Sequence, residues 1–280
     1  MATLDNPLRK YFRQPAIHLR LPSGGRNWPA QAISMPPNGE LPIYPMTAVD
    51  EITSRTPDAL FNGSAVTDII RSCVPAIHDP WATPASDITA LLVAIRLASY
   101  GHSMEMGTKC PKCSEENEYS LDLRTVLDGL KSGDYETPLQ SGDLTIYFTP
   151  MTYQQLNENN RVQFEDQKMI QSLNSAEIDE EEKLRLLTEI YKKVSELTVI
   201  SIRNSITMIK TADAIVSEPQ FIDEFLRNCR KEVFEAIRDR AVELREQSDV
   251  RPLKLTCPSC QHQYEQTFTL DLSNFFETAS

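Results

Sequence analysis

Two cysteine pairs of the same form, far apart in the chain, restrict the fold more than any other feature of the sequence. They are Cys110-Pro-Lys-Cys113 and Cys257-Pro-Ser-Cys260. Their flanks repeat as well, because the first pair leads into a stretch that ends at residues 121–123 and the second into one that ends at 270–272, both reading Leu-Asp-Leu. Each copy therefore predicts a strand, a C-P-x-C turn and a returning strand.

Two such turns are typical of a structural zinc site. Structural Zn²⁺ takes four ligands in a tetrahedron, with Zn–S distances of about 2.3 Å. Two thiolates three residues apart in a tight turn can occupy two corners, and a second turn supplies the other two. We therefore predict one structural zinc per chain, with these ligands: Cys110, Cys113, Cys257 and Cys260.

The separation of the pairs is unusual. The pairs of an ordinary zinc ribbon are about 15–20 residues apart, whereas Cys113 and Cys257 are 144 positions apart. A shared metal makes residues 114–256 an insertion between the halves of one split ribbon. Closing a loop of this length costs roughly 4–5 kcal/mol, and structural zinc contributes roughly 10–16 kcal/mol in small peptides. The metal can therefore offset the closure.

Other interpretations of the cysteines stay open. A thioredoxin-like redox pair requires the motif at a helix start, whereas both pairs here lead into predicted strands. The two turns can also be buried and metal-free, and His262 is a further potential ligand. Cys73 and Cys229 lie on or beside apolar helix faces and are predicted to be inert thiols.

No catalytic constellation emerges from the rest of the chain. Cys73, His78 and Asp79 are close in sequence, but Pro75 separates the thiol from the histidine and nothing positions an oxyanion hole. With only 9 glycines, the chain has no phosphate-binding glycine loop, and HExxH and GxSxG motifs are absent. We predict that the protein is not an enzyme and has no catalytic residues.

The charge balance and the hydropathy pattern argue against two classes of protein. With 28 basic and 40 acidic side chains, the formal charge of −12 repels nucleic-acid phosphate. No apolar run approaches the length of about 20 residues that crosses a membrane. The N-terminal stretch lacks the apolar region of a secretory signal. We expect synthesis in a reducing cytoplasm, where cysteines serve as thiols or metal ligands.

Prolines and basic residues gather toward the start of the chain. Twelve of the 18 prolines fall within residues 1–84, and proline blocks helix interiors. Residues 1–39 have a net charge of +4, against −16 for the rest. A basic arm that also contains Tyr11, Phe12 and Trp28 suits an acidic partner subunit at least as well as a nucleic acid.

The pattern predicts an α+β fold. It consists of a Pro-rich extended N-terminal region, a helical core, and the split Cys₄ zinc ribbon of two hairpins with a long helical insertion. The predicted boundaries are 1–46 for the extended arm and strand region, 47–102 for the helical core, 103–123 and 250–273 for the two ribbon halves, and 124–249 for the mainly helical insertion.

Three local features of the helices are also predicted. Ser86 or Asp87 caps an almost wholly apolar helix that ends at Gly101, and its Arg96 needs a partner or a route to solvent. Apolar residues at helical spacing predict two stripes. The first is an apolar stripe of Leu184, Leu187, Tyr191, Val194 and Leu197 or Thr198, and the second points inward and comprises Phe221, Ile222, Phe225 and Leu226. Residues 199–209 are compatible with a buried helix or a strand.

Four stretches of the chain match one known family. They are LPSGGRNWP at 21–29, LPIYPMTAVDEITSRTPDALFNG at 41–63, VTDIIRSCVP at 66–75 and SDITALLVAIRLASYG at 86–101. In these stretches, and in the order of its elements up to the cysteine hairpins, the chain resembles the baseplate hub and baseplate-assembly proteins of contractile-tailed, T-even-like bacteriophages.

The resemblance implies a structural protein of the virion, in the tail baseplate at or near the hub, made in the host cytoplasm. Its implied partners are other baseplate and tail proteins, and further copies of itself in a symmetric assembly. It supplies no catalytic residues. Members of the family need not all carry both cysteine pairs, so the zinc prediction rests on this sequence alone. Three alternatives stay open: an assembly chaperone absent from the mature virion, a zinc-ribbon nucleic-acid factor, and a thiol enzyme.

Overall fold

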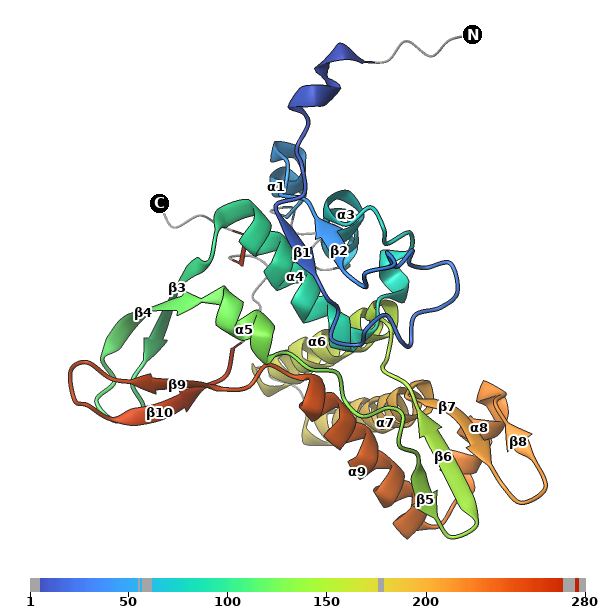
Figure 1. Cartoon of the computed structure of the whole chain (residues 1–280). Helices are drawn as coiled ribbons and strands as arrows, with labels where there is room; N and C mark the ends of the chain where they lie inside the picture. Colours follow the sequence, from blue (N-terminus) through green and yellow to red (C-terminus); the bar gives the residue numbers. More distant parts are fainter. Residues whose placement is uncertain (1–5, 55, 57–61, 176–178, 269–274, 277–280) are drawn as a thin grey trace.

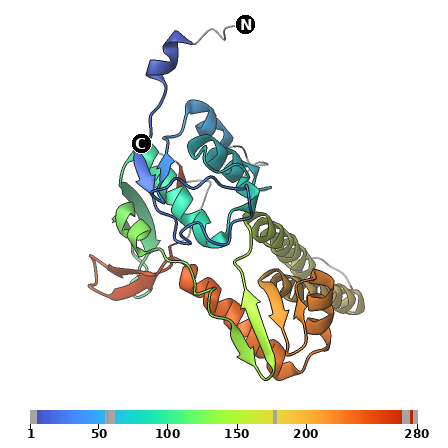
Figure 2. The same ribbon diagram turned by 45° about the vertical axis from the view of Figure 1, so that its right-hand side comes forward.

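The computed structural model describes residues 6–54, 56, 62–175, 179–268 and 275–276, and it has the predicted α+β class (Figure 1). Two hydrophobic cores organise the described chain. A first lobe holds the N-terminal strands and helices, a second holds a four-stranded sheet, and the cysteine hairpins project to one side of both (Figures 1 and 2). Within the described residues, no helix combines the length and the apolar character that a membrane span requires.

The first lobe is built around one apolar helix. Its elements are η1 (Pro7–Tyr11), β1 (Ile17–Leu19), β2 (Leu41–Ile43), α1 (Ala48–Ser54), α3 (Ser64–Cys73), η2 (Pro80–Ala82), α4 (Ala85–Tyr100) and α5 (Leu123–Gly129). The antiparallel pair β1–β2 and helix α3 pack against α4, whose residues 90–95 are all buried. Gly101 ends α4 with a φ of 86°, a conformation that favours glycine.

Arg96 of α4 has the partner that its burial requires. Its guanidinium donates to the carbonyl of Phe275 and lies 5.3 Å from the centroid of the Phe275 ring. Phe275 and Phe276 are both buried in the first core. A segment near the end of the chain therefore completes the core that the N-terminal third begins.

The prediction that Ser86 or Asp87 caps α4 is wrong. The helix begins at Ala85, with Pro84 as its N-cap residue and no side-chain cap. The N–H of Ala85 donates instead to the carbonyl of Met151, at 2.8 Å. Asp87 is fully buried and accepts hydrogen bonds from Ser23 and Trp28 of the N-terminal loop. A tertiary contact has taken the place of the local cap.

The second lobe is a sheet covered by helices. Its strands, in the order β5-β6-β7-β8, are β5 (Leu139–Ser141), β6 (Leu144–Phe148), β7 (Ile206–Lys210) and β8 (Ile215–Val216), all antiparallel to their neighbours. Helices α8 (Pro219–Asn228) and α9 (Lys231–Ser248) complete the core. Residues 199–209 prove to be both a helix end and a strand, which meet at Ser205.

Two long helices, α6 (Tyr153–Ser175) and α7 (Glu180–Asn204), pack against each other beside the two lobes. The apolar stripe predicted for α7 is not a buried face, because Leu184, Tyr191 and Val194 are exposed and Leu187 and Leu197 are half-buried. The buried residue of this stretch is Ile190. A helical period shows that a face is apolar, but not that this chain covers it.

The inward stripe predicted for α8 is correct at three of its four positions. Ile222 and Leu226 are buried as predicted, and Phe225 packs against the same core. Phe221, however, is exposed. Positions 222 and 226 are one helical turn apart and share a face, whereas position 221 lies about 100° around the helix from 222.

Candidate metal centre

The two cysteine turns have the same backbone structure. Hairpin β3–β4 (Ser103–Lys109 and Glu116–Asp122) carries the first turn, and hairpin β9–β10 (Leu253–Thr256 and Gln263–Gln266) carries the second. In each turn the first cysteine N–H donates to a carbonyl five residues later, and its own carbonyl accepts from the N–H four residues later, all at 2.9 Å. Ser114 and Gln261 have matching φ angles of 60° and 59°. The sequence repeat is therefore a structural repeat at the two turns, whereas residues 269–273 of the predicted second ribbon half lie outside the described residues.

The fold brings the four predicted ligands into one cluster. The sulfurs of Cys110, Cys113, Cys257 and Cys260 all lie within 4.8 Å of one another. Cys110 Sγ is 3.7 Å from Cys260 Sγ, and Cys113 Sγ is 3.7 Å from Cys257 Sγ. A tetrahedron with Zn–S bonds of about 2.3 Å has sulfur–sulfur edges of about 3.8 Å. The pairs across the two turns therefore have the spacing that a shared tetrahedral ion requires.

Backbone N–H groups of the turns stabilise negative charge on two of the clustered sulfurs. The N–H of Cys260 is the largest influence on Cys257 and lowers the pKa of this thiol to about 6. Desolvation opposes ionisation of Cys110, but the N–H groups of Cys113 and Lys112 lower its pKa overall. The N–H of Glu115 favours the Cys113 thiolate, yet desolvation and hydrogen bonds with the other sulfurs raise its pKa to about 12. The raised pKa of Cys113 keeps its proton on, whereas the lowered pKa values of Cys110 and Cys257 favour their thiolates.

Polar side chains join the two hairpins around the sulfurs. Asn117 is buried, and its amide donates to Cys257 Sγ at 3.6 Å and to the Glu115 carbonyl at 3.1 Å. The hydroxyls of Tyr119 and Tyr264 are 3.2 Å apart. Sequence reasoning missed Asn117, although the repeat contains a signal: Asn117 and Tyr264 both lie four residues after the second cysteine of their turns. At this equivalent position the first hairpin has Asn117, which donates to a sulfur, and the second hairpin has Tyr264.

The remaining candidates do not join this cluster. The ring of His262 stacks against Tyr264, with centroids 6.4 Å apart, and the metal-ligating group found among the described residues comprises cysteines alone. Cys73 is fully buried and burial raises its pKa to about 12, while burial also raises the pKa of Cys229. His78 is hydrogen-bonded to Ser34 instead of activating the Cys73 thiol.

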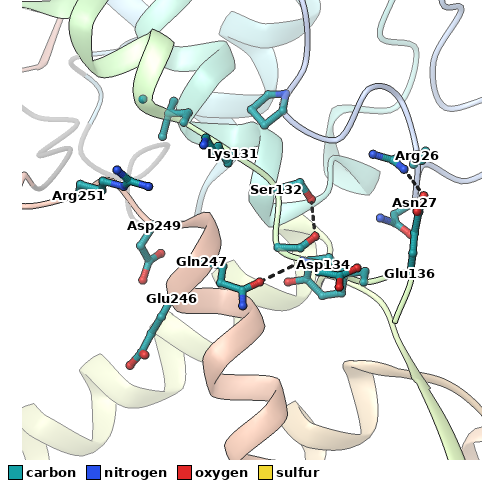
Figure 3. A pocket seen from close by; sticks show the side chains of 15 residues that line it. Arg26, Asn27, Lys131, Ser132, Asp134, Glu136, Glu246, Gln247, Asp249 and Arg251 are labelled. Atoms are coloured by element: carbon teal, nitrogen blue, oxygen red, sulfur yellow. Dashed lines mark hydrogen bonds and ion pairs between the residues drawn. The ribbon is translucent and has the colours of Figure 1, made fainter. Parts of the chain in front are cut away.

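A polar cleft of about 730 Å³ lies where residues 129–136 cross the end of α9 (Figure 3). Its charged side chains are of both signs. Arg26 pairs with Glu136, and the side chain of Gln247 accepts from the N–H of Asp134 at 3.1 Å. The N–H of Gly133 donates to the Ser248 hydroxyl at 2.8 Å. These contacts tie the connecting segment to α9, so the cleft marks the junction between the lobes.

Comparison with known proteins identifies the family of the chain. The sequence model of the family described as "T4 bacteriophage base plate protein" matches residues 15–277. No curated protein and no solved structure has significant similarity to the chain. The matched range contains both cysteine hairpins and the whole helical segment between them, so the chain belongs to the T4 bacteriophage base plate protein family.

Proposed function

We propose that this protein is a structural component of the phage tail baseplate, at or near the hub. It holds neighbouring tail proteins together in a symmetric assembly that contains several copies of the chain. The family supports a baseplate role and contact with other tail proteins. Within that role we assign a non-enzymatic function, because the family is described as a base plate protein and the four cysteines of the candidate centre have the spacing of a structural metal site.

We further propose that one structural zinc binds to Cys110, Cys113, Cys257 and Cys260. The clustering of four sulfurs from two distant hairpins is the observation that carries this proposal. Four thiolates at tetrahedral spacing are the donor set of structural zinc. The lowered pKa of Cys257 favours the ionised form that a metal binds, and the Asn117 amide stabilises the same sulfur.

In this proposal residues 103–123 and 250–273 are one ribbon unit, and residues 124–249 are an insertion with both ends attached to it. Residues 1–46 and 47–102 are the arm and strand region and the helical core. Zinc would clamp the two ends of the insertion and fix its direction. The insertion then presents its surface to neighbouring proteins, while the N-terminal arm reaches another subunit.

Metal analysis of the purified protein tests the zinc proposal. We expect about one zinc per chain, and loss of that zinc in the variants Cys113→Ser and Cys260→Ser. Cys229→Ser is the matched control and keeps the metal, because Cys229 lies outside the cluster. The proposal fails if the native protein contains no zinc and all four clustered cysteines are readily alkylated.

Whether the protein is present in the mature phage particle distinguishes the baseplate role from its main alternative. An assembly chaperone that leaves before maturation fits the same family and cluster. Quantitative mass spectrometry of purified phage particles distinguishes them: a baseplate component is present in stoichiometric amounts, and a chaperone is absent. Salt-sensitive nucleic-acid binding by the purified protein would instead support the zinc-ribbon nucleic-acid factor, and disulfide reductase activity would support the thiol enzyme.

A further inference from the structure

The described N-terminal arm stands clear of the molecule. Residues 6–12 are all exposed, and Figures 1 and 2 both show η1 projecting away from the first lobe. Leu8 is 59% exposed, Tyr11 73% and Phe12 55%. Lys10 lies 5.0 Å from the centre of the Tyr11 ring, and Arg9 adds a second basic side chain. Three large apolar groups on one short, basic segment are the composition of a docking element.

The base of the arm is firmly attached, so its direction is set by the fold. Arg13 donates to the Ser72 carbonyl at 2.7 Å, to the Ser72 hydroxyl at 2.8 Å and to the Asp50 carboxylate at 3.3 Å. It also donates to the carbonyl of Pro45, and its guanidinium lies 5.9 Å from the Tyr44 ring. A guanidinium with this many partners costs little further entropy when the arm binds something.

Helix α7 presents a second exposed apolar surface. Leu184 is 67% exposed, Tyr191 65% and Val194 42%. Together with half-buried Leu187 they follow the 3-4-3 spacing of a helix–helix contact. The stripe begins beside the exposed acidic side chains of Asp179, Glu181 and Glu182. Basic side chains also border the stripe, namely Lys183, Arg185, Lys192 and Lys193, and Arg185 pairs with Glu182 and Glu189.

We propose that the arm of one copy docks on the α7 stripe of a second copy. This inference rests on the proposed symmetric assembly and names the contact that builds it. The two surfaces lie far apart on one molecule in both views of the structure (Figures 1 and 2), so the contact joins two chains. The net charges of +4 for residues 1–39 and −16 for the remaining chain favour association of an arm with another copy's body.

The proposed contact is head-to-tail, because it joins two different surfaces. A head-to-tail contact forms a closed ring when its rotation closes, and an open filament when it does not. A ring suits an assembly around a tail axis. Each copy then donates one arm and accepts one, so every apolar side chain of both surfaces is covered.

Two variants separate the donor and acceptor surfaces. The arm variant carries Leu8→Ser, Tyr11→Ser and Phe12→Ser, and the stripe variant carries Leu184→Gln, Tyr191→Gln and Val194→Gln. All six side chains are exposed, so circular dichroism should show both variants folded. Phe221→Ser is the matched control, because Phe221 is 52% exposed on α8.

Sedimentation and light scattering of purified protein across a concentration series measure self-association. We expect the wild-type chain and the control to associate and both triple variants to be monomeric, with association weakened about tenfold or more for each anchor removed. Lys10→Glu and added salt should also weaken association, since the charges involved are exposed. Mixing the two triple variants should restore a 1:1 heterodimer, because each retains the surface that the other lacks.

The results identify which idea fails. A monomeric wild-type chain overturns both the arm contact and the proposed self-assembly. A wild-type oligomer that both triple variants still form overturns the arm contact alone and leaves the symmetric assembly in place. Monomeric variants that do not pair on mixing show that the arm and the stripe do not bind each other, which overturns the head-to-tail contact.

Discussion

Replacing Asp87 with alanine should destabilise the first lobe strongly. The Asp87 carboxylate is fully buried at the start of α4 and accepts three hydrogen bonds. It accepts from the Ser23 N–H at 2.9 Å, the Ser23 hydroxyl at 2.5 Å and the Trp28 indole N–H at 2.8 Å. These bonds hold the loop that begins LPSGG against α4, although the two segments are about 60 residues apart.

The size of the effect follows from the donors left behind. The Ser23 hydroxyl can turn to another acceptor, but its N–H and the Trp28 indole cannot. A buried donor without a partner costs about 1–3 kcal/mol. The Ser23 N–H is buried and the Trp28 indole is half-buried, so the two together cost up to about 6 kcal/mol. Removing the carboxylate also relieves its desolvation. We therefore expect Asp87→Ala to lower the free energy of unfolding by about 3 kcal/mol.

Urea denaturation followed by circular dichroism and Trp fluorescence measures this loss. The matched control is Asp79→Ala, since Asp79 is an exposed aspartate that caps η2 through the N–H of Trp81; its removal should cost about 1 kcal/mol. A loss of less than 1 kcal/mol for Asp87→Ala would refute the assignment of Asp87 as the link between loop and helix.

The pH dependence of the unfolding free energy is a second test of the role of Asp87. Burial raises the pKa of Asp87 above its ordinary value of 3.8, although the Ser23 and Trp28 donors oppose this. A raised pKa in the folded state means that the folded protein binds the proton more tightly than the unfolded chain. Relative to Asp87→Asn, the wild-type protein should therefore lose stability as pH rises from 3.8 through the folded-state pKa. An unfolding free-energy difference that is constant with pH contradicts this assignment.

Two further predictions concern the junction and the buried thiol. Gly133→Ala should lower the free energy of unfolding by about 1–3 kcal/mol, because a Cβ would lie 2.4 Å from the Leu244 carbonyl oxygen; Gly129→Ala, with open space around it, should be tolerated in the same urea titration. Cys73 should resist alkylation at pH 8 in the native protein, since it is fully buried and its pKa is raised to about 12; rapid labelling detected by mass spectrometry would contradict its packed position.

The sequence was most informative where a short motif specifies local geometry. The C-P-x-C pairs and their repeated flanks predict both hairpins, and the structure gathers their four sulfurs. Gly101 ends α4 as predicted, because a positive φ is a local requirement that glycine meets. Arg96 was correctly expected to need a partner, but its partner comes from Phe275, which no local pattern identifies.

The predictions failed where distant segments compete with local rules. Asp87 has the chemistry of a helix cap, but three donors from residues 23 and 28 take its carboxylate. The α7 stripe has the period of a buried face, but the described residues leave Leu184 and Tyr191 exposed. Sequence periodicity is the same for a core and for a surface that meets another molecule, so only the fold separates them.

Because the two cysteine turns are far apart in the sequence, the ribosome synthesises them at different times. The ribosome makes Cys113 well before Cys257, and the 144 positions between them take roughly 7–29 s at about 5–20 residues per second. During that interval the first turn offers only two sulfurs. A chain that stops before Cys260 never completes the set, so a full cluster requires that synthesis has passed the second turn.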